Sequence, residues 1–135
     1  MHSKTMLVAI FFTALVVSGC FGPKKVANVQ EMIVEFEFEV AECTDRKTSP
    51  EIRVKNVPDG TVFLQAKFRD LDYLSYNHGG GIIEYKGGGI IPTGALEHYT
   101  SPCSPSKDNR YEFTVKALNG DKSLVLGEGK AMRRQ

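Results

Sequence analysis

The feature that most constrains the fold is a strict alternation of apolar and polar side chains. In EMIVEFEFEV, residues 31–40, every second residue is apolar, and three of the four residues between them are glutamates. EIRVKNV, TVFLQAKFRD and YEFTVKAL, at residues 51–57, 61–70 and 111–118, alternate in the same way. Side chains of a β-strand point to opposite faces in turn, so each segment predicts a strand with one buried face.

The segments between these strands indicate the fold class. SLVLGEGKAM, residues 123–132, is typical of a closing strand, and turn sequences such as PDG and LNGDK separate the strands. After the N-terminal apolar run, the sequence shows no convincing apolar stripe of an amphipathic helix. Short strands with glycine and proline turns predict a mainly β domain, either a sandwich or a barrel.

The first nineteen residues are typical of an export signal. Lys4 precedes MLVAIFFTALVV, an apolar run that is too short to span a membrane but suits a signal peptide. The run ends in VSGC, and small residues before a cysteine resemble the lipobox of bacterial lipoproteins. We expect a lipoprotein signal peptide over residues 1–19, cleavage before Cys20 and a lipid anchor, including palmitate, on that cysteine. An ordinary secretory signal with a chance cysteine is the alternative.

The remainder of the 135-residue chain is enough for one small domain. We expect a lipidated polar tether over residues 20–29 and one β domain over residues 30–135. The whole chain has a formal net charge of +1, and Lys4 is the charge lost with the signal peptide. The mature chain is therefore formally neutral, which argues against a nucleic-acid partner.

The residue after the expected lipid site bears on location. Phe21 follows Cys20, where an aspartate commonly marks retention in the inner membrane. The sequence therefore predicts a lipid-anchored protein of the bacterial cell envelope that faces the periplasm, with the outer membrane favoured.

The cysteine count predicts one covalent link. Lipid on Cys20 leaves Cys43 and Cys103, and an even pair in an oxidising compartment is typical of a disulfide. Such a bond would close a loop of about 60 residues and contribute roughly 4 kcal/mol in the chain-entropy model. Two buried free thiols are the alternative, whereas a metal pair is disfavoured because neither cysteine has a cysteine or histidine nearby in sequence.

Polar side chains end the inward faces of two predicted strands. Asp70 continues the even-numbered apolar face of one strand, and Tyr111 begins the apolar face of another, with Arg110 beside it on the opposite face. His78 follows in the stretch RDLDYLSYNHGGG. A carboxylate, an imidazole and a phenol at one end of a sandwich favour a small polar pocket. A turn-forming aspartate and a surface histidine are the alternative.

Five blocks of sequence occur in a specific order between about Thr48 and Lys130: SPEIRVKNVPDGTVFLQAKFRDLD, NHGGG, IPTGAL, YTSPCSPSKDNRYEFTVKAL and LGEGK. Together they resemble the phosphatidylethanolamine-binding protein (PEBP) family, also called Raf kinase inhibitor-like proteins. Bacterial members typically read S-P-E-L/I and V-P-x-G-T, then D-P-D-A-P, a tryptophan-flanked histidine, G-P-C-P-P, H-R-Y-x-F-x-V-x-A-L and G-x-G-x. The resemblance implies a PEBP-like antiparallel β-sandwich with short helices at most, here in a short bacterial lipoprotein form.

The resemblance also implies a small anion-binding pocket that accepts phosphate-like head groups. Matched by position, its ligand-binding residues are Asp70, His78, Pro102, Arg110 and Tyr111. No catalytic residue, metal or cofactor is expected.

The chain departs from the family pattern at several positions. Both prolines of D-P-D-A-P are missing, and Asn77 and Gly79 replace the tryptophans around the histidine, so we expect its apolar wall to be lost. Asn109 stands where the family has a second pocket histidine; it can form hydrogen bonds but adds no positive charge. The helix that family members insert before the last strand is also absent from the sequence. Asp72 is expected to fix the loop or to pair with the arginine.

Two other site classes are disfavoured by the sequence. A metal site built from Asp70, Asp72 and His78 would lack a further close ligand, and Ser75 near His78 has no surrounding nucleophile motif. We therefore expect a non-catalytic protein, anchored to the membrane through Cys20, that binds a small anion or phospholipid head group. Because the family also contains inhibitors of proteases and kinases, the alternative is a protein-binding module or envelope scaffold with a degenerate pocket.

Overall fold

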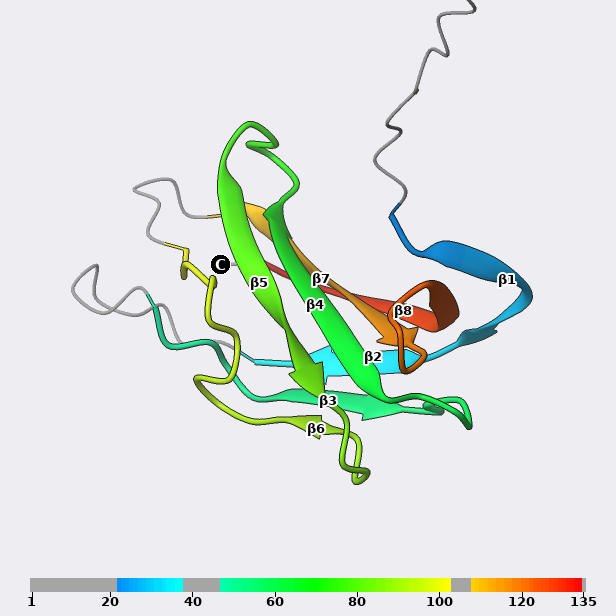
Figure 1. Cartoon of the computed structure of the whole chain (residues 1–135). Coiled ribbons are helices and arrows are strands. Elements are labelled where there is room, and N and C mark those ends of the chain that lie inside the picture. The colour runs from blue at the N-terminus through cyan, green and yellow to red at the C-terminus, as the bar shows by residue number, and fades with distance from the viewer. Residues whose placement is uncertain (1–21, 38–46, 103–107, 135) are drawn as a thin grey trace, which may run out of the picture.

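The computed structural model describes residues 22–37, 47–102 and 108–134. Within these residues the chain forms eight strands and no helix (Figure 1). The strands are β1 (Lys24–Glu31), β2 (Ile33–Phe36), β3 (Ile52–Lys55), β4 (Phe63–Asp70), β5 (Asn77–Glu84), β6 (Ile90–Ile91), β7 (Arg110–Leu118) and β8 (Leu124–Arg134).

The strands form two sheets. The large sheet has the order β1-β8-β7-β4-β5, and the small sheet has the order β2-β3-β6. All neighbours are antiparallel except β1 and β8, which run parallel, so the large sheet is mixed. The prediction of a mainly β fold is confirmed, although this one strand pair departs from a purely antiparallel sandwich.

The apolar faces of the two sheets pack against each other. Alternation in β4 buries Leu64, Ala66 and Phe68. The Phe68 ring centroid lies 4.4 Å from that of Phe113 in β7, and the Phe36 ring from β2 meets Phe113 edge-on at 4.8 Å. These aromatic contacts join the sheets, and burial of such rings is a large part of the stability of a small domain.

Strand β1 covers most of the segment that the sequence analysis assigned to a polar tether. Lys24 pairs with Leu124 and Glu31 with Glu128 along β8. Most of its side chains are exposed and the rest only partly buried, so the strand is held chiefly by backbone hydrogen bonds. Without a buried face the segment has no apolar alternation, which is why its sequence did not indicate a strand.

The chain passes from the large sheet to the small sheet at Met32. The Met32 N–H donates to the Glu128 carbonyl at 2.9 Å, which places this crossing directly over β8. A Cβ on Gly129 would overlap the Met32 carbonyl oxygen and lie 2.8 Å from Cγ2 of Val34. The second glycine of GEGK therefore has a structural role, because only a residue without a side chain lets the backbone approach so closely.

Several predictions concern residues outside the described part of the chain. The signal peptide, Cys20, Cys43 and Cys103 all lie there. Across residues 22–37, 47–102 and 108–134, the structure contains no helix long and apolar enough to cross a bilayer.

Candidate functional site

The candidate site lies where β4 ends and where β5 and β7 begin. Asp70 is the last residue of β4 and is the cross-strand partner of Tyr111 in β7. His78 is the second residue of β5, which pairs with the other edge of β4. Because β4 is antiparallel to both neighbours, its end meets both of their starts. Asp70 and His78 are each 4% exposed, and Tyr111 is 1% exposed.

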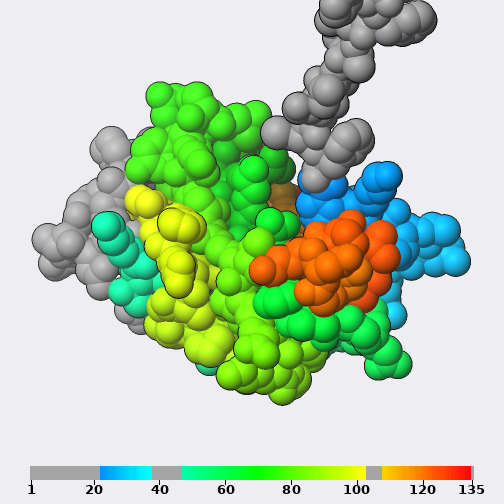
Figure 2. All heavy atoms as spheres, viewed as in Figure 1, coloured from blue at the N-terminus to red at the C-terminus, as the bar shows by residue number. Residues whose placement is uncertain are grey.

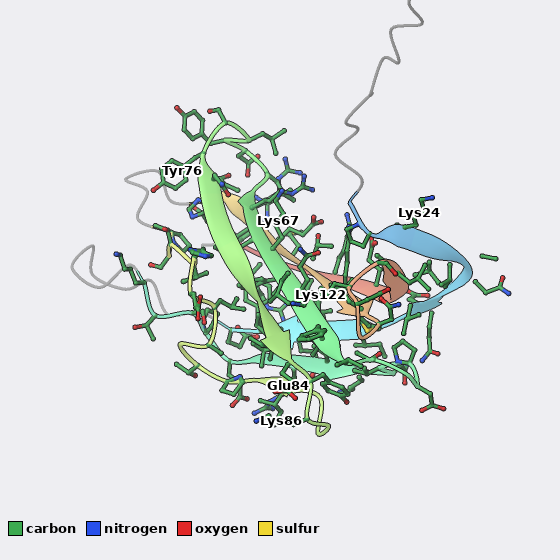
Figure 3. All side chains as sticks on the ribbon, in the orientation of Figure 1. Lys24, Lys67, Tyr76, Glu84, Lys86 and Lys122 are labelled. Carbon is green, nitrogen blue, oxygen red and sulfur yellow. The ribbon has the colours of Figure 1, made fainter. Side chains whose placement is uncertain are left out.

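Aromatic rings surround the His78 imidazole. Its ring centroid lies 4.6 Å from that of Tyr76, 5.4 Å from Phe68 and 5.6 Å from Tyr111, each in an edge-on arrangement. Tyr76 is the last residue of the β4–β5 loop and lies in the upper part of the view in Figure 3. The expectation that the histidine lacks an apolar wall is therefore wrong, because these three rings pack against it.

Backbone contacts fix the orientation of the His78 ring. Nδ1 lies 2.8 Å from the Thr100 carbonyl oxygen, and the Thr100 N–H donates to the His78 carbonyl at 2.9 Å. A carbonyl oxygen only accepts, so Nδ1 carries a hydrogen. Nε2 is therefore an acceptor in the neutral ring and a donor in the protonated ring.

The Asp70 carboxylate holds the loop that follows β4. Oδ1 accepts hydrogen bonds from the backbone N–H groups of Asp72 at 2.8 Å and Tyr73 at 3.0 Å. Oδ2 accepts from Nδ2 of Asn109 at 2.8 Å. The interpretation of Asp70 as a turn former is thus correct, and the same carboxylate also links the end of β4 to the residue that precedes β7.

The Tyr111 hydroxyl is held in its neutral form. Burial raises the pKa of Tyr111, and the negative charge of Asp70 raises it further, while a hydrogen bond with Asn109 opposes them. A neutral phenol can donate a hydrogen bond to an anion. Asp70, His78 and Tyr111 are buried and, with the partly buried Asn109, form one polar cluster.

Arg110 does not join this cluster. Its Nη2 lies 2.8 Å from Oδ1 of Asp72, and its backbone N–H donates to Oδ2 of Asp72 at 2.6 Å. Neighbouring residues of a strand point to opposite faces, so the guanidinium lies away from the side chain of Tyr111. The expected pairing of Asp72 with the arginine is confirmed, whereas the expectation that Arg110 converges with the other site residues is not met.

Pro102 is buried in the segment that leads away from Thr100. The Ser101 hydroxyl donates to the Pro102 carbonyl at 3.3 Å. Both the N–H and the carbonyl of Thr100 form hydrogen bonds with His78, so this segment is attached to the cluster two residues before Pro102.

Comparison with known proteins identifies the fold. No protein-family model matches the sequence, and no curated protein matches it. The structure is similar to the crystal structure of a putative phosphatidylethanolamine-binding protein homolog from Chlamydia trachomatis. The TM-score is 0.52 and the identity 16%, and the match covers 76% of this chain and 95% of the other. The fold is PEBP-like.

Within this PEBP-like fold, three contributors to the cluster were not predicted as site residues. Asn109 appeared only as a departure from the H-R-Y block, yet it bonds directly to Asp70. Its place two residues before Tyr111, which directs it to the same face, was the signal that could have identified it. Tyr76 and the Thr100 carbonyl reach His78 from loop segments, and no local sequence pattern indicates such contacts.

The carboxylate oxygens of the disfavoured metal site have other partners in this PEBP-like fold. Those of Asp70 face loop amides and Asn109, and those of Asp72 face Arg110. In the described ranges, no group of three histidine, cysteine, aspartate or glutamate side chains is placed to hold a metal ion.

The ion pair between Asp72 and Arg110 predicts a small acid dependence of stability. Hydrogen bonds from the Arg110 side chain and backbone lower the pKa of Asp72 below its usual value. A carboxyl with a lower pKa in the folded state stabilises the protein above its unfolded pKa of about 3.9 and loses this contribution as the pH falls further. We expect the melting temperature of wild type to fall more steeply below about pH 4 than that of Asp72→Asn. The difference is small because both side chains are partly exposed.

Melting curves across the acid range test this expectation. Asp59→Asn is the matched control, since Asp59 is an exposed aspartate in a turn. Parallel acid profiles for wild type and Asp72→Asn would contradict a role for the ion pair.

Proposed function

We propose that this chain is a lipid-anchored bacterial envelope protein that binds a small anion or a phospholipid head group without catalysing a reaction. The observation that carries the proposal is the polar cluster of Asp70, His78, Asn109 and Tyr111 at one end of the PEBP-like fold. A few convergent polar groups in apolar surroundings are what orients a small ligand in a binding site.

The chemistry of the cluster suits a zwitterionic or anionic head group. The Tyr111 hydroxyl, the Asn109 amide and a protonated His78 ring are hydrogen-bond donors for phosphoryl oxygens. Asp70 accepts three hydrogen bonds from the loop and from Asn109, and a further hydrogen bond with the Tyr111 hydroxyl helps to raise the pKa of Tyr111. The ammonium group of an ethanolamine head group would take the place of that hydroxyl on the carboxylate and so free it to donate to a phosphoryl oxygen.

A second candidate function is a protein-binding module, either inhibitor-like or a scaffold, with a degenerate pocket. Two observations favour it. Asp70 already accepts hydrogen bonds from the loop that follows it, and Arg110 is already paired with Asp72. Tyr73 and Leu74, which follow in the same loop, are 61% and 69% exposed and could contact a partner.

A titration separates the two candidates. We expect phosphoethanolamine and inorganic phosphate to bind wild type, and His78→Gln to bind at least about tenfold more weakly, since a hydrogen bond to a charged group contributes about 1.5–3 kcal/mol. His98→Gln is the control, because His98 is exposed and takes no part in the cluster. Tyr111→Phe removes only a hydroxyl and provides a second variant if His78→Gln does not fold. Equal binding by all four proteins, or none by wild type, would favour the protein-binding module.

The lipid anchor is proposed on the VSGC sequence that ends at Cys20. The mature protein should begin at Cys20, carry acyl chains there and face the periplasm, with the outer membrane favoured. Intact-mass measurement of the membrane fraction tests this directly, with Cys20→Ser as the unlipidated control. A mature wild-type protein without acyl mass would refute the anchor while leaving the head-group proposal open.

A further inference from the structure

The outer face of the large sheet carries a cluster of basic side chains. Lys67 and Arg69 come from β4, Lys116 from β7 and Lys130 from β8. Together with neighbouring polar residues they line a hollow of about 370 Å³. Lys67 and Lys130 lie on either side of Thr114 in one cross-strand row, and Lys116 is diagonal to both. Diagonal neighbours on adjacent strands lie about 7–8 Å apart, or less at the side-chain tips.

The positive charge of this basic face is only partly neutralised. Glu112 lies 3.3 Å from Arg69 and 3.5 Å from Lys130, whereas Glu128 is 2.9 Å from a different lysine, Lys25 of β1. Among the described residues, neither Lys67 nor Lys116 forms an ion pair within 4 Å, although the positive charge of Lys116 helps to lower the pKa of its cross-strand partner Glu128. Since the whole chain has a formal charge of only +1, the excess on this face is a local feature of the fold.

An exposed apolar loop adjoins the basic face. The connection between β4 and β5 starts directly after Arg69 and Asp70, and it carries Tyr73, Leu74 and Tyr76 with 61%, 69% and 38% exposure. In Figure 1 this loop projects beyond the sheet at the top of the view. Tyrosine and leucine at a protruding tip suit the boundary between water and lipid, because an aromatic ring there has both apolar and polar surroundings.

The first strand brings the expected lipid site close to the same sheet. Three residues separate Cys20 from Lys24, where β1 begins. An extended chain spans at most about 3.6 Å per residue, so the start of β1 lies within about 14 Å of the lipid-bearing residue. Figure 2 shows the surface hollowed between the green atoms of β4 and the blue atoms of β1, and Figure 3 shows Lys24 and Lys67 on the upper side of the molecule.

We propose that the basic face and the tip of the β4–β5 loop form a membrane-facing surface that lies against anionic lipid head groups. The proposed lipid anchor is what would hold this surface at the bilayer, and that step rests on the proposed function. The affinity of the surface for anionic lipid does not depend on the anchor. A lysine near an anionic bilayer contributes about 1 kcal/mol, so several together hold the domain against the membrane to which it is anchored. The occupant is the surface of a bilayer, which is distinct from a single head group in the polar cluster.

Vesicle sedimentation of the mature chain with Cys20→Ser tests the surface without the lipid. The probes are vesicles of phosphatidylcholine alone and vesicles that also contain phosphatidylglycerol. We expect binding only to the anionic vesicles, weakened by salt. Lys67→Gln with Lys116→Gln should lower the partition coefficient about 20–30-fold, because each lysine accounts for about fivefold. Tyr73→Ser with Leu74→Ser should weaken binding as well.

The control removes the same charge elsewhere. Lys55 lies in β3 of the small sheet, and Lys86 lies at the lower end of the view in Figure 3. Lys55→Gln with Lys86→Gln should bind anionic vesicles like the parent, with all melting temperatures alike. Phosphatidylcholine carries the same phosphoryl group without a net charge, so the contrast between the two vesicle types separates this test from that of the head-group cluster. Equal binding to both vesicle types, equal loss in the control, or binding of soluble polyphosphate without binding of vesicles would overturn the proposal.

Discussion

Replacing Phe68 by alanine is expected to lower the free energy of unfolding by about 3–5 kcal/mol, the largest effect of any single change considered. Phe68 is fully buried, and its ring centroid lies 4.4 Å from Phe113, 5.4 Å from His78 and 5.6 Å from Tyr111. Removing the ring leaves a cavity between the two sheets, which hydrogen-bonded strands cannot close. It also removes the wall on which the imidazole and the phenol pack.

Phe63→Ala provides the matched control on the same strand. Phe63 points to the opposite face of β4, is only partly buried and has Nζ of Lys122 4.2 Å from its ring centroid. Its loss should cost about 1 kcal/mol. Urea unfolding of both variants measures the difference, and equal losses would mean that Phe68 does not occupy the core position described.

Replacing Asn109 by aspartate is expected to lower the free energy of unfolding by about 1–3 kcal/mol at neutral pH. The substitution places a second carboxylate where Nδ2 of Asn109 now donates to Asp70 at 2.8 Å. Two like charges at this distance repel each other, and a partly buried hydrogen bond is lost.

The double variant with Asp70→Asn and Asn109→Asp should recover most of that loss. The amide introduced at position 70 would keep an oxygen for the loop N–H groups and would donate a hydrogen to the new carboxylate at position 109, so the polarity of the contact is reversed. A double-mutant cycle measures the coupling between the two positions. Losses that simply add in the double variant would show that the two side chains do not bond in solution.

Alternation predicted the parts of the fold in which one strand face is buried. β3, β4 and β7 follow directly from it, and Ile52, Val54 and Phe68 are buried as expected. β1 and β5 could not be predicted in this way. β1 has no buried face, and β5 contains three successive glycines, so neither shows a contrast between its two faces.

The glycines of β5 have a physical role that the sequence does not reveal. A Cβ on Gly80 would lie 2.9 Å from the Ala66 carbonyl carbon and even closer to its oxygen, and the φ of Gly80 is +149°. The backbone of β5 therefore lies directly against that of β4, with no side chain between them. This close approach brings His78 alongside Phe68.

Strand parity and the family resemblance gave different expectations for Arg110, and parity was correct. Parity directed Asp70 and Tyr111 inward, and both are buried. It directed Arg110 outward, where the structure pairs it with Asp72, although the resemblance placed it among the ligand-binding residues. His78 came from its place in the polar stretch RDLDYLSYNHGGG and from the resemblance, because β5 shows no alternation that could place it. The contacts of Asn109, Thr100 and Tyr76 join segments far apart in sequence or lie in loops, so no local pattern could predict them.

The central claim is that the cluster of Asp70, His78, Asn109 and Tyr111 binds a phosphate-containing head group. The most direct test is a crystal of the protein soaked in phosphoethanolamine. We predict density beside the cluster, with phosphoryl oxygens within hydrogen-bond distance of the Tyr111 hydroxyl and Nε2 of His78, and the ammonium group toward Asp70. A fully occupied ligand elsewhere on the protein, or a cluster that stays free of ligand at saturating concentration, would contradict the claim.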